Sequence, residues 1–340
     1  MVPELRFTST PLMDLPVLAR EAGIGRVFVK AECDRPLGNF KVLGGTLASL
    51  RALAGQPAAT RLLCASDGNH GLAVAVAAHA SGALARIYLP VGVSPRRAVR
   101  IEAAGGEIAW IAGTYDDAVE AAARAAANGE GILIPDTTSR PSDPVVEDVM
   151  EGYGRICIEL AEQLPAPPTH MFVQAGVGGL AAAMAEGLHG RMAAPKRLVV
   201  VEPEAAACVA AGLRAGRPVR LDGDLHTCAE MLSCGLASAP ALRILVQHDA
   251  QALLVSEEAL ERAGEVLRGA GGPSTTPSGA AGLAGLLTAS RVAAIRTRFE
   301  LASDSRVLII ATEGDPVAAP SGAGVLNWTW GGSPGAPAIE

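Results

Sequence analysis

The chain has 340 residues, of which 49% are hydrophobic and 19% charged, so it can bury a large core and its composition excludes a disordered protein. Its net charge of −7 and its aromatic content of 3% argue against a nucleic-acid-binding surface. At a prior of about 150 residues per domain, the length predicts two domains.

The cysteines, the N-terminus and the apolar stretches indicate where the protein works. The six cysteines are scattered and form no Cys-x-x-Cys pair, and His226, Cys228 and Cys234 lack the spacing of metal ligands. The first residues show no basic segment followed by an apolar run. Gly, Pro or a charged residue interrupts each apolar stretch before the roughly 18–20 residues that a membrane span needs. We therefore expect a cytoplasmic protein without a metal, membrane or nucleic-acid partner.

Short apolar runs alternate with helical patterns along the whole chain. The runs that predict strands are 26–30, 61–66, 85–90, 107–112, 132–136, 170–175, 197–203, 252–256 and 306–312. Several of them lack alternation, which is typical of strands buried on both faces. Residues 42–53, residues 72–80 and an apolar stripe from Val146 to Leu164 predict helices between them. This order predicts an α/β protein with open, twisted, mostly parallel sheets flanked by helices.

The first unusual turn lies in residues 35–45 and contains Lys41. This lysine stands between two glycine-containing turns and opens an apolar helix. A cation at a helix N-terminus is disfavoured by the helix dipole, so we expect a lowered pKa for the Lys41 amine. A neutral amine can attack a carbonyl group. The simpler interpretation of this motif alone is a surface lysine in a first helical turn.

The second turn is Ser66-Asp-Gly-Asn-His-Gly71, between an apolar strand and a helix. Its glycines allow close ligand approach, and Ser66, Asn69 and His70 lie beside the free N–H groups of the helix start. This arrangement predicts a corner that binds anions and hydroxyl groups. The alternative is an ordinary capped turn, with Asp67 as the capping residue.

Two further turns follow later strands. In Gln174–Leu180, the glycines at 176, 178 and 179 can direct several backbone N–H groups at one phosphate. The spacing is not that of a dinucleotide fingerprint, although Glu202, roughly 20 residues further on, keeps that alternative open. Thr312, at the end of the last strand, can hydrogen-bond a heteroaromatic nitrogen, or can belong to a plain turn.

Together and in this order, the four turns resemble the fold type II pyridoxal-phosphate (PLP) enzymes, the tryptophan synthase β family, over about residues 8–316. The resemblance implies two open sheets, with the cofactor in a cleft between two domains. These are a large PLP-binding domain, residues 1–40 and 145–340, and a small mobile domain, residues 41–144. It also implies a homodimer that acts on a small amino acid.

Within this family the details look like the diaminopropionate ammonia-lyases. The shared features are the aspartate in Ser66–Gly71, the lysine motif Phe40–Gly45 and the segment Ile134-Pro-Asp-Thr137. The chain departs from the pattern after Asp136, where residues 137–143 replace an aromatic-containing stretch. The implied reaction is α,β-elimination on 2,3-diaminopropionate, giving pyruvate and ammonia.

The resemblance implies a role for each cofactor-binding motif. Lys41 would carry the cofactor through a Schiff base, Asn69 would hydrogen-bond the ring hydroxyl, and Thr312 would face the pyridine nitrogen. A hydroxyl at that nitrogen favours prompt β-elimination over transamination. The cofactor's phosphate would lie against Gly176, Val177, Gly178, Gly179 and Leu180.

Two carboxylates are the expected catalytic partners of Lys41. Asp67 can act as a general base at the substrate's α-carbon or pair with its β-ammonium group, and Asp136 can supply a second acidic contact. With Lys41 on the opposite face of the substrate, two bases would permit elimination from both L and D isomers. The substrate itself is expected to bind to Ser66, Asp67, Gly68, His70 and Asp136.

Other functions are compatible with parts of the pattern. A serine or threonine dehydratase, or another β-eliminating or β-replacing enzyme, would keep the cofactor and change the substrate. A non-catalytic ligand-binding homologue would not need Lys41. A dinucleotide-binding oxidoreductase would bind NAD and lack the cofactor's visible absorbance.

Overall fold

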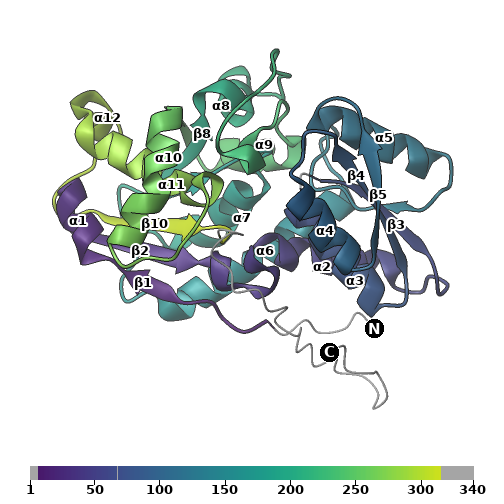
Figure 1. The fold of residues 1–340 in the computed structure, drawn as a ribbon. Helices are drawn as coiled ribbons and strands as arrows, with labels where there is room; N and C mark the ends of the chain where they lie inside the picture. The colour runs from purple at the N-terminus through teal and green to yellow at the C-terminus, as the bar shows by residue number, and fades with distance from the viewer. Residues whose placement is uncertain (1–6, 67, 315–340) are drawn as a thin grey trace.

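The computed structural model describes residues 7–66 and 68–314, which form two lobes, each built around a sheet (Figure 1). The six-stranded sheet has the order β1-β2-β10-β7-β8-β9, and the four-stranded sheet has the order β5-β4-β3-β6. The pairing of β1 with β2 is antiparallel, and the other strand pairs described are parallel. The strands are β1 (Leu12–Asp14), β2 (Arg26–Ala31), β3 (Arg61–Ala65), β4 (Leu84–Pro90), β5 (Gly106–Ile111), β6 (Ile132–Leu133), β7 (His170–Gln174), β8 (Arg197–Pro203), β9 (Gln251–Val255) and β10 (Arg306–Ala311).

Helices connect the parallel strands and cover the sheets (Figure 1). Within the described residues, none is long and apolar enough to cross a bilayer. Short 3-10 turns include η1 (Glu32–Asp34), η2 (Pro36–Gly38) and η5 (Glu230–Leu232). The α-helices are α1 (Pro16–Ala22), α2 (Lys41–Leu53), α3 (Asn69–Ala80), α4 (Pro95–Ala103), α5 (Tyr115–Ala127), α6 (Pro144–Gln163), α7 (Gly179–Leu188), α8 (Cys208–Ala215), α9 (Ala239–Gln247), α10 (Glu257–Gly269), α11 (Pro277–Arg291) and α12 (Ala293–Arg298).

The predicted α/β class with mostly parallel sheets is confirmed, with two differences among the strands. The run 132–136 was expected to be a strand, but β6 ends at Leu133. Pro135 has no N–H to continue the ladder, so the chain turns there towards the cleft. Strand β1 was not predicted, because its three residues are too few to show a period of two.

Several helices begin at caps that the sequence encodes. The carboxylate of Asp143 accepts hydrogen bonds from the first turn of α6, whose first residue is Pro144. Thr114 and Asp117 form a capping box at the start of α5. At the start of α2, Asn39 accepts from the Lys41 N–H at 3.0 Å, and at the start of α3, Ser66 accepts from the Gly71 N–H at 2.8 Å. In contrast, the residue before α7 provides no side-chain cap, so the first N–H groups of α7 are available to other partners.

Helices α2 and α6 cross at a pair of glycines. A Cβ atom on Gly152 would lie 2.6 Å from the Cα of Gly44, and one on Gly44 would lie 2.4 Å from the carbonyl oxygen of Val149. Neither position has room for a side chain, because the facing atoms belong to the backbone. This close crossing places Tyr153 of α6 beside the first turn of α2, where its ring lies 4.8 Å from that of Phe40.

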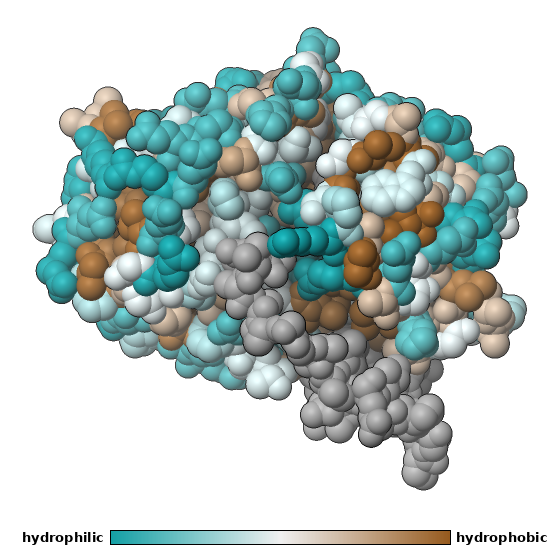
Figure 2. Space-filling model, in the orientation of Figure 1, coloured by the Kyte–Doolittle hydropathy of each residue, from teal (hydrophilic) through white to brown (hydrophobic). Residues whose placement is uncertain are grey.

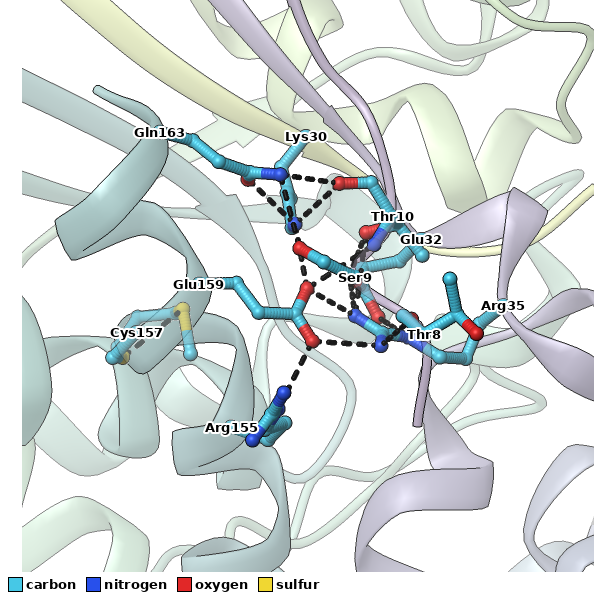
Figure 3. A network of polar contacts seen from close by, with 11 residues as sticks. Thr8, Ser9, Thr10, Lys30, Glu32, Arg35, Arg155, Cys157, Glu159 and Gln163 are labelled. Carbon is cyan, nitrogen blue, oxygen red and sulfur yellow. Dashed lines mark hydrogen bonds and ion pairs between the residues drawn. The ribbon is translucent and has the colours of Figure 1, made fainter. Parts of the chain in front are cut away.

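A buried network of charged groups fixes the segment that leads to α2 (Figure 3). The ammonium of Lys30, in β2, donates to Glu159 at 2.7 Å and to the carbonyl oxygen of Thr10 at 2.7 Å. The guanidinium of Arg35 donates to both carboxylate oxygens of Glu159, at 2.8 and 2.9 Å, and to Glu32. Glu159 belongs to α6, so these contacts join β2 of the six-stranded sheet, and the segment after it, to the helix that α2 crosses.

Polar contacts also join the two lobes across the cleft. Hydrophilic side chains lie between the lobes on the face seen in Figure 2. Arg97 of α4 pairs with Glu230 of η5 at 2.9 Å, and Arg100 donates to the carbonyl oxygen of Leu37 at 2.7 Å. Both arginines come from the lobe with the four-stranded sheet, whereas their partners belong to the other lobe.

Candidate active site

A pocket with an empty volume of about 790 Å³ lies between the two sheets. Its walls are the loops that follow the carboxyl ends of β3, β6, β7 and β10, where open α/β sheets bind ligands. The structure brings most of the predicted site residues together here. Asp67 lies outside the described residues, and the others line the pocket: Lys41, Ser66, 68–70, Asp136, 176–180 and Thr312.

Lys41 and Asp136 form an ion pair in this pocket. The ammonium nitrogen of Lys41 lies 2.5 Å from Oδ2 of Asp136, and Tyr115 donates its hydroxyl to Oδ1 at 2.7 Å. Asp136 is 7% exposed. Burial raises the pKa of Asp136, but the adjacent Lys41 ammonium, together with His70 and the Tyr115 hydroxyl, outweighs burial and holds that pKa well below its usual range.

The prediction that the pKa of Lys41 is lowered is wrong. Lys41 is the first residue of α2, as predicted. Burial lowers the pKa of its amine, but the Asp136 carboxylate and the other groups around the amine together raise that pKa by more, so the net direction is upward. The sequence could not show this pairing, because the two residues are 95 positions apart. The amine becomes a nucleophile once a ligand separates it from Asp136 or a proton transfer leaves it neutral.

His70 is a neutral, buried imidazole. Its Nε2 lies 2.9 Å from the carbonyl oxygen of Ile134, so Nε2 carries the proton, and its Nδ1 has no hydrogen-bond partner among the described residues. Burial lowers the pKa of His70. Tyr153 is 2% exposed, as expected of a core residue, yet it also lines the pocket. Burial raises its pKa, so its phenol is protonated near neutral pH.

The loop after β7 forms a cradle of backbone N–H groups. Gly178 has φ of +97° and directly precedes α7, whose start has no side-chain cap. A Cβ atom on Gly176 would lie 3.0 Å from Sγ of Cys234 and 3.2 Å from the carbonyl oxygen of Met231. The glycines therefore bring the backbone close to the pocket, beside the positive end of the α7 dipole. This is the arrangement that binds a phosphate group.

Thr312 and Asn69 come from different lobes, and both line the pocket. The Thr312 hydroxyl accepts a hydrogen bond from Nε2 of Gln174 at 3.0 Å, and Gln174 belongs to β7. The Asn69 amide nitrogen donates to the carboxylate of Glu313, which is 7% exposed. Three further residues of the pocket were not predicted from the sequence: Gln174, Tyr115 and Glu313. Two of them adjoin predicted site residues, since Gln174 precedes the glycine loop and Glu313 follows Thr312. Nothing in the sequence marked Tyr115.

Glu202, whose position left dinucleotide binding as an alternative, forms its hydrogen bonds within its own lobe. It is fully buried in β8, and its carboxylate accepts hydrogen bonds from the backbone N–H groups of Val209 and Ala210 at 2.7 Å each. It therefore caps α8 and does not face a ribose site. Within residues 7–66 and 68–314, no group of three or more His, Cys, Asp or Glu residues could hold a metal ion.

The pocket's donors fit PLP. An amine on Lys41, an N–H cradle at 176–180 and a hydroxyl on Thr312 match an aldehyde, a phosphate and a pyridine nitrogen. The His70 Nδ1, to which no described residue donates, leaves polar capacity for a ligand. When bound, PLP supplies an aldehyde that condenses with amines and a ring that accepts electrons from a substrate's α-carbon.

The chain matches a known protein family over most of its length. A family model described as "Pyridoxal-phosphate dependent enzyme" matches residues 4–313. The chain therefore belongs to the family of pyridoxal-phosphate-dependent enzymes, and PLP is its cofactor.

Among its relatives, the chain is similar to diaminopropionate ammonia-lyase of Salmonella typhimurium, with 31% identity over 91% of this chain and 86% of that protein. A crystal structure of the Escherichia coli diaminopropionate ammonia-lyase, in complex with an aminoacrylate–PLP azomethine reaction intermediate, superposes with a TM-score of 0.79. It has 28% identity and covers 91% of this chain and 85% of that chain. A crystal structure of the threonine deaminase of T.th. superposes with a TM-score of 0.76 at 27% identity, over 92% of this chain and 95% of that chain.

Proposed function

We propose that this protein is a PLP-dependent ammonia-lyase that converts 2,3-diaminopropionate to pyruvate and ammonia by α,β-elimination. The observation that carries the proposal is the buried Asp136 carboxylate beside Lys41, in a pocket whose other described lining residues are mostly neutral. A substrate with a second ammonium group gains a charged partner there, whereas a hydroxyl-bearing substrate does not. The likeness to diaminopropionate ammonia-lyases supports the same substrate class.

The cofactor is proposed to lie between the two lobes. Lys41 binds its aldehyde, the backbone N–H groups of 176–180 bind its phosphate, Asn69 contacts its ring hydroxyl and Thr312 faces its pyridine nitrogen. The hydroxyl of Thr312 already accepts from Gln174, so it is oriented to donate its own hydrogen towards the pocket. It therefore leaves the pyridine nitrogen unprotonated.

The substrate is proposed to lie against the Ser66–His70 loop and Asp136. Ser66 is oriented by two contacts, since its Oγ accepts from the backbone N–H groups of Gly68 at 2.9 Å and Gly71 at 2.8 Å. Asp136 holds the substrate's β-ammonium group or takes a proton at its Oδ2, and Lys41 holds a proton on its Nζ. Asp67 is proposed as the second carboxylate.

A second candidate is a serine or threonine dehydratase, which the likeness to a threonine deaminase favours. The two candidates differ in the group that leaves the substrate's β-carbon, which is ammonia in one case and water in the other. A carboxylate stabilises a β-ammonium group in the ground state but contributes little to a neutral hydroxyl. Relative turnover of the two substrate types therefore decides between them.

The test measures the products that the cofactor-loaded protein releases from five substrates. Pyruvate and ammonia are measured with L- and D-2,3-diaminopropionate, L-serine and O-acetyl-L-serine. With L-threonine, 2-oxobutyrate and ammonia are measured. We expect the highest kcat/KM with diaminopropionate, and an increase in serine turnover in Asp67→Ser. Lys41→Ala should lack both turnover and the visible absorbance of the bound cofactor, whereas the exposed Lys196→Ala should keep both. Turnover of serine or threonine above diaminopropionate would favour the dehydratase, and absence of visible absorbance in the wild type would refute the cofactor site.

Three expectations accompany the proposal. The large domain (1–40 and 145–340) and the small mobile domain (41–144) are proposed to move relative to each other as substrate enters, and the Arg97–Glu230 pair across the cleft supports such a boundary. The homodimer and the cytoplasmic location stay predictions from the family. Sedimentation of the holoenzyme and fractionation of the source cells would test them.

A further inference from the structure

We propose that Glu313 is a positioning residue that fixes the side-chain amide of Asn69, so that an N–H of Asn69 and not its carbonyl oxygen faces the ring oxygen of the bound cofactor. This inference rests on the role proposed for Asn69 and adds the group that sets its orientation.

The contact geometry gives Glu313 two donors. The Nδ2 of Asn69 donates to Oε2 of Glu313, and the Thr276 hydroxyl donates to Oε1 at 2.5 Å. Rotating the Asn69 amide by half a turn would place its carbonyl oxygen against a carboxylate oxygen, which is repulsive. The Nδ2 group carries two hydrogens, so one binds Glu313 and the second stays available to a ligand in the pocket.

The Glu313 backbone is a rigid reference for this contact. Glu313 forms an isolated β-bridge with Asn39, and its carbonyl oxygen accepts a hydrogen bond from the Thr275 hydroxyl. The next residue, Gly314, donates its N–H to the carbonyl oxygen of Gly38 at 2.9 Å. These bonds hold Glu313 from two segments, one directly before α2 and one directly before α11.

The hydrogen bonds around Glu313 suit an accepting carboxylate. Burial raises the pKa of Glu313, and although the hydrogen bonds from Thr276 and Asn69 and the guanidinium groups of Arg97 and Arg100 act in the opposite direction, the net direction is upward. Neither hydrogen-bond partner needs a proton from Glu313, because both are donors. The network is therefore complete with Glu313 as an acceptor on both oxygens.

The contact also crosses the cleft. Asn69 begins α3, in the lobe of the four-stranded sheet, whereas Glu313 follows β10 of the six-stranded sheet. The Asn69 amide is thus oriented by a group from the opposite lobe. Its correct orientation depends on the two lobes being in contact.

The experiment compares Glu313→Leu, Glu313→Gln and Asn69→Ala by the Kd for PLP and by the position of the visible absorbance of the bound cofactor, which responds to hydrogen bonds at its ring oxygen. Glu313→Leu frees the amide, and we expect a Kd raised about fivefold to tenfold and a shifted absorbance maximum. Glu313→Gln can turn its oxygen to Asn69 and its nitrogen to the Thr276 oxygen, so it should stay within about twofold of wild type. Glu230→Leu, which removes a carboxylate that also contacts the opposite lobe, is the matched control and should not shift the absorbance.

Each outcome decides the inference. An unchanged Kd and spectrum in Glu313→Leu, with Asn69→Ala impaired, overturns the role of Glu313 and leaves that of Asn69. If Asn69→Ala is unchanged, the proposed contact between Asn69 and the cofactor fails, and the inference fails with it. If Glu313→Gln is as impaired as Glu313→Leu, the charge and not the orientation of the amide matters, and the inference is wrong. A thermal unfolding curve for each variant separates these effects from loss of folding.

Discussion

The ammonium of Lys41 and the carboxylate of Asp136 lie 2.5 Å apart, although one begins a helix and the other follows a short strand 95 residues later. Each holds the other in its charged form inside the pocket between the lobes. A substrate ammonium group that enters the pocket can replace Lys41 as the partner of Asp136. Without that carboxylate, burial would lower the pKa of the Lys41 amine, so that it could release its proton and then act as a base.

Removing the Tyr115 hydroxyl should weaken catalysis without removing the carboxylate. In Tyr115→Phe, Asp136 loses the hydrogen bond at 2.7 Å that stabilises its charged form, so its pKa rises. We expect kcat/KM for the preferred substrate to fall about tenfold and its acidic limb to move to higher pH. Tyr88→Phe, in β4, is the control and should leave the profile as in wild type. An unshifted acidic limb in Tyr115→Phe would contradict this assignment.

Gly178→Ala should weaken cofactor binding more than it weakens the fold. Its φ of +97° is unfavourable for alanine, by about 1–2 kcal/mol, and relief of this strain would turn the N–H groups at the start of α7 away from the phosphate. We expect the Kd for PLP, measured by equilibrium dialysis, to rise about tenfold. Gly216 lies at the end of α8 with φ of +66°, and a Cβ atom added there would meet nothing within 4 Å. Gly216→Ala imposes a similar strain and should leave the Kd unchanged, and equal effects of the two variants would argue against a phosphate site.

Glu159→Ala should destabilise the protein strongly. The substitution leaves Lys30 and Arg35 buried without their shared carboxylate, and breaking a buried ion pair costs about 3–5 kcal/mol (Figure 3). Urea denaturation should show this loss in the free energy of unfolding. Glu162→Ala, on the same helix but at an exposed position, should change it by less than about 0.5 kcal/mol. A comparable small loss in Glu159→Ala would show that the network contributes little.

The same network predicts a pH dependence of stability. Burial raises the pKa of Glu159, but the hydrogen bonds and charges of Arg35 and Lys30 outweigh it and lower the pKa from 4.5 to about 2. A carboxyl group whose pKa is lower in the folded state stabilises the fold above its unfolded pKa, and this contribution is lost as the pH falls through the folded value. The free energy of unfolding should therefore decline between about pH 4.5 and about pH 2 more steeply in wild type than in Glu159→Gln. Parallel pH curves for the two proteins would exclude this contribution.

The sequence by itself determined the alternation of strands and helices, the position of Lys41 at a helix start and the glycine loop at 176–180. These features depend on local chemistry: apolar runs, turn residues and glycines act over a few neighbouring residues. The resemblance then connected four separate turns to one cofactor. The predicted end of β6 was too late. The extent of this strand depended on Pro135 and on the strand's partners.

Only the tertiary structure decided which polar groups meet. The expected direction of the Lys41 pKa was reversed, since the carboxylate of Asp136, 95 residues away in the chain, and the other groups around the amine together outweigh burial. The contacts of Tyr115 with Asp136 and of Glu313 with Asn69 likewise join distant segments. Electrostatic and hydrogen-bond energies depend on distances of a few ångströms in space, and local sequence patterns carry no record of those distances.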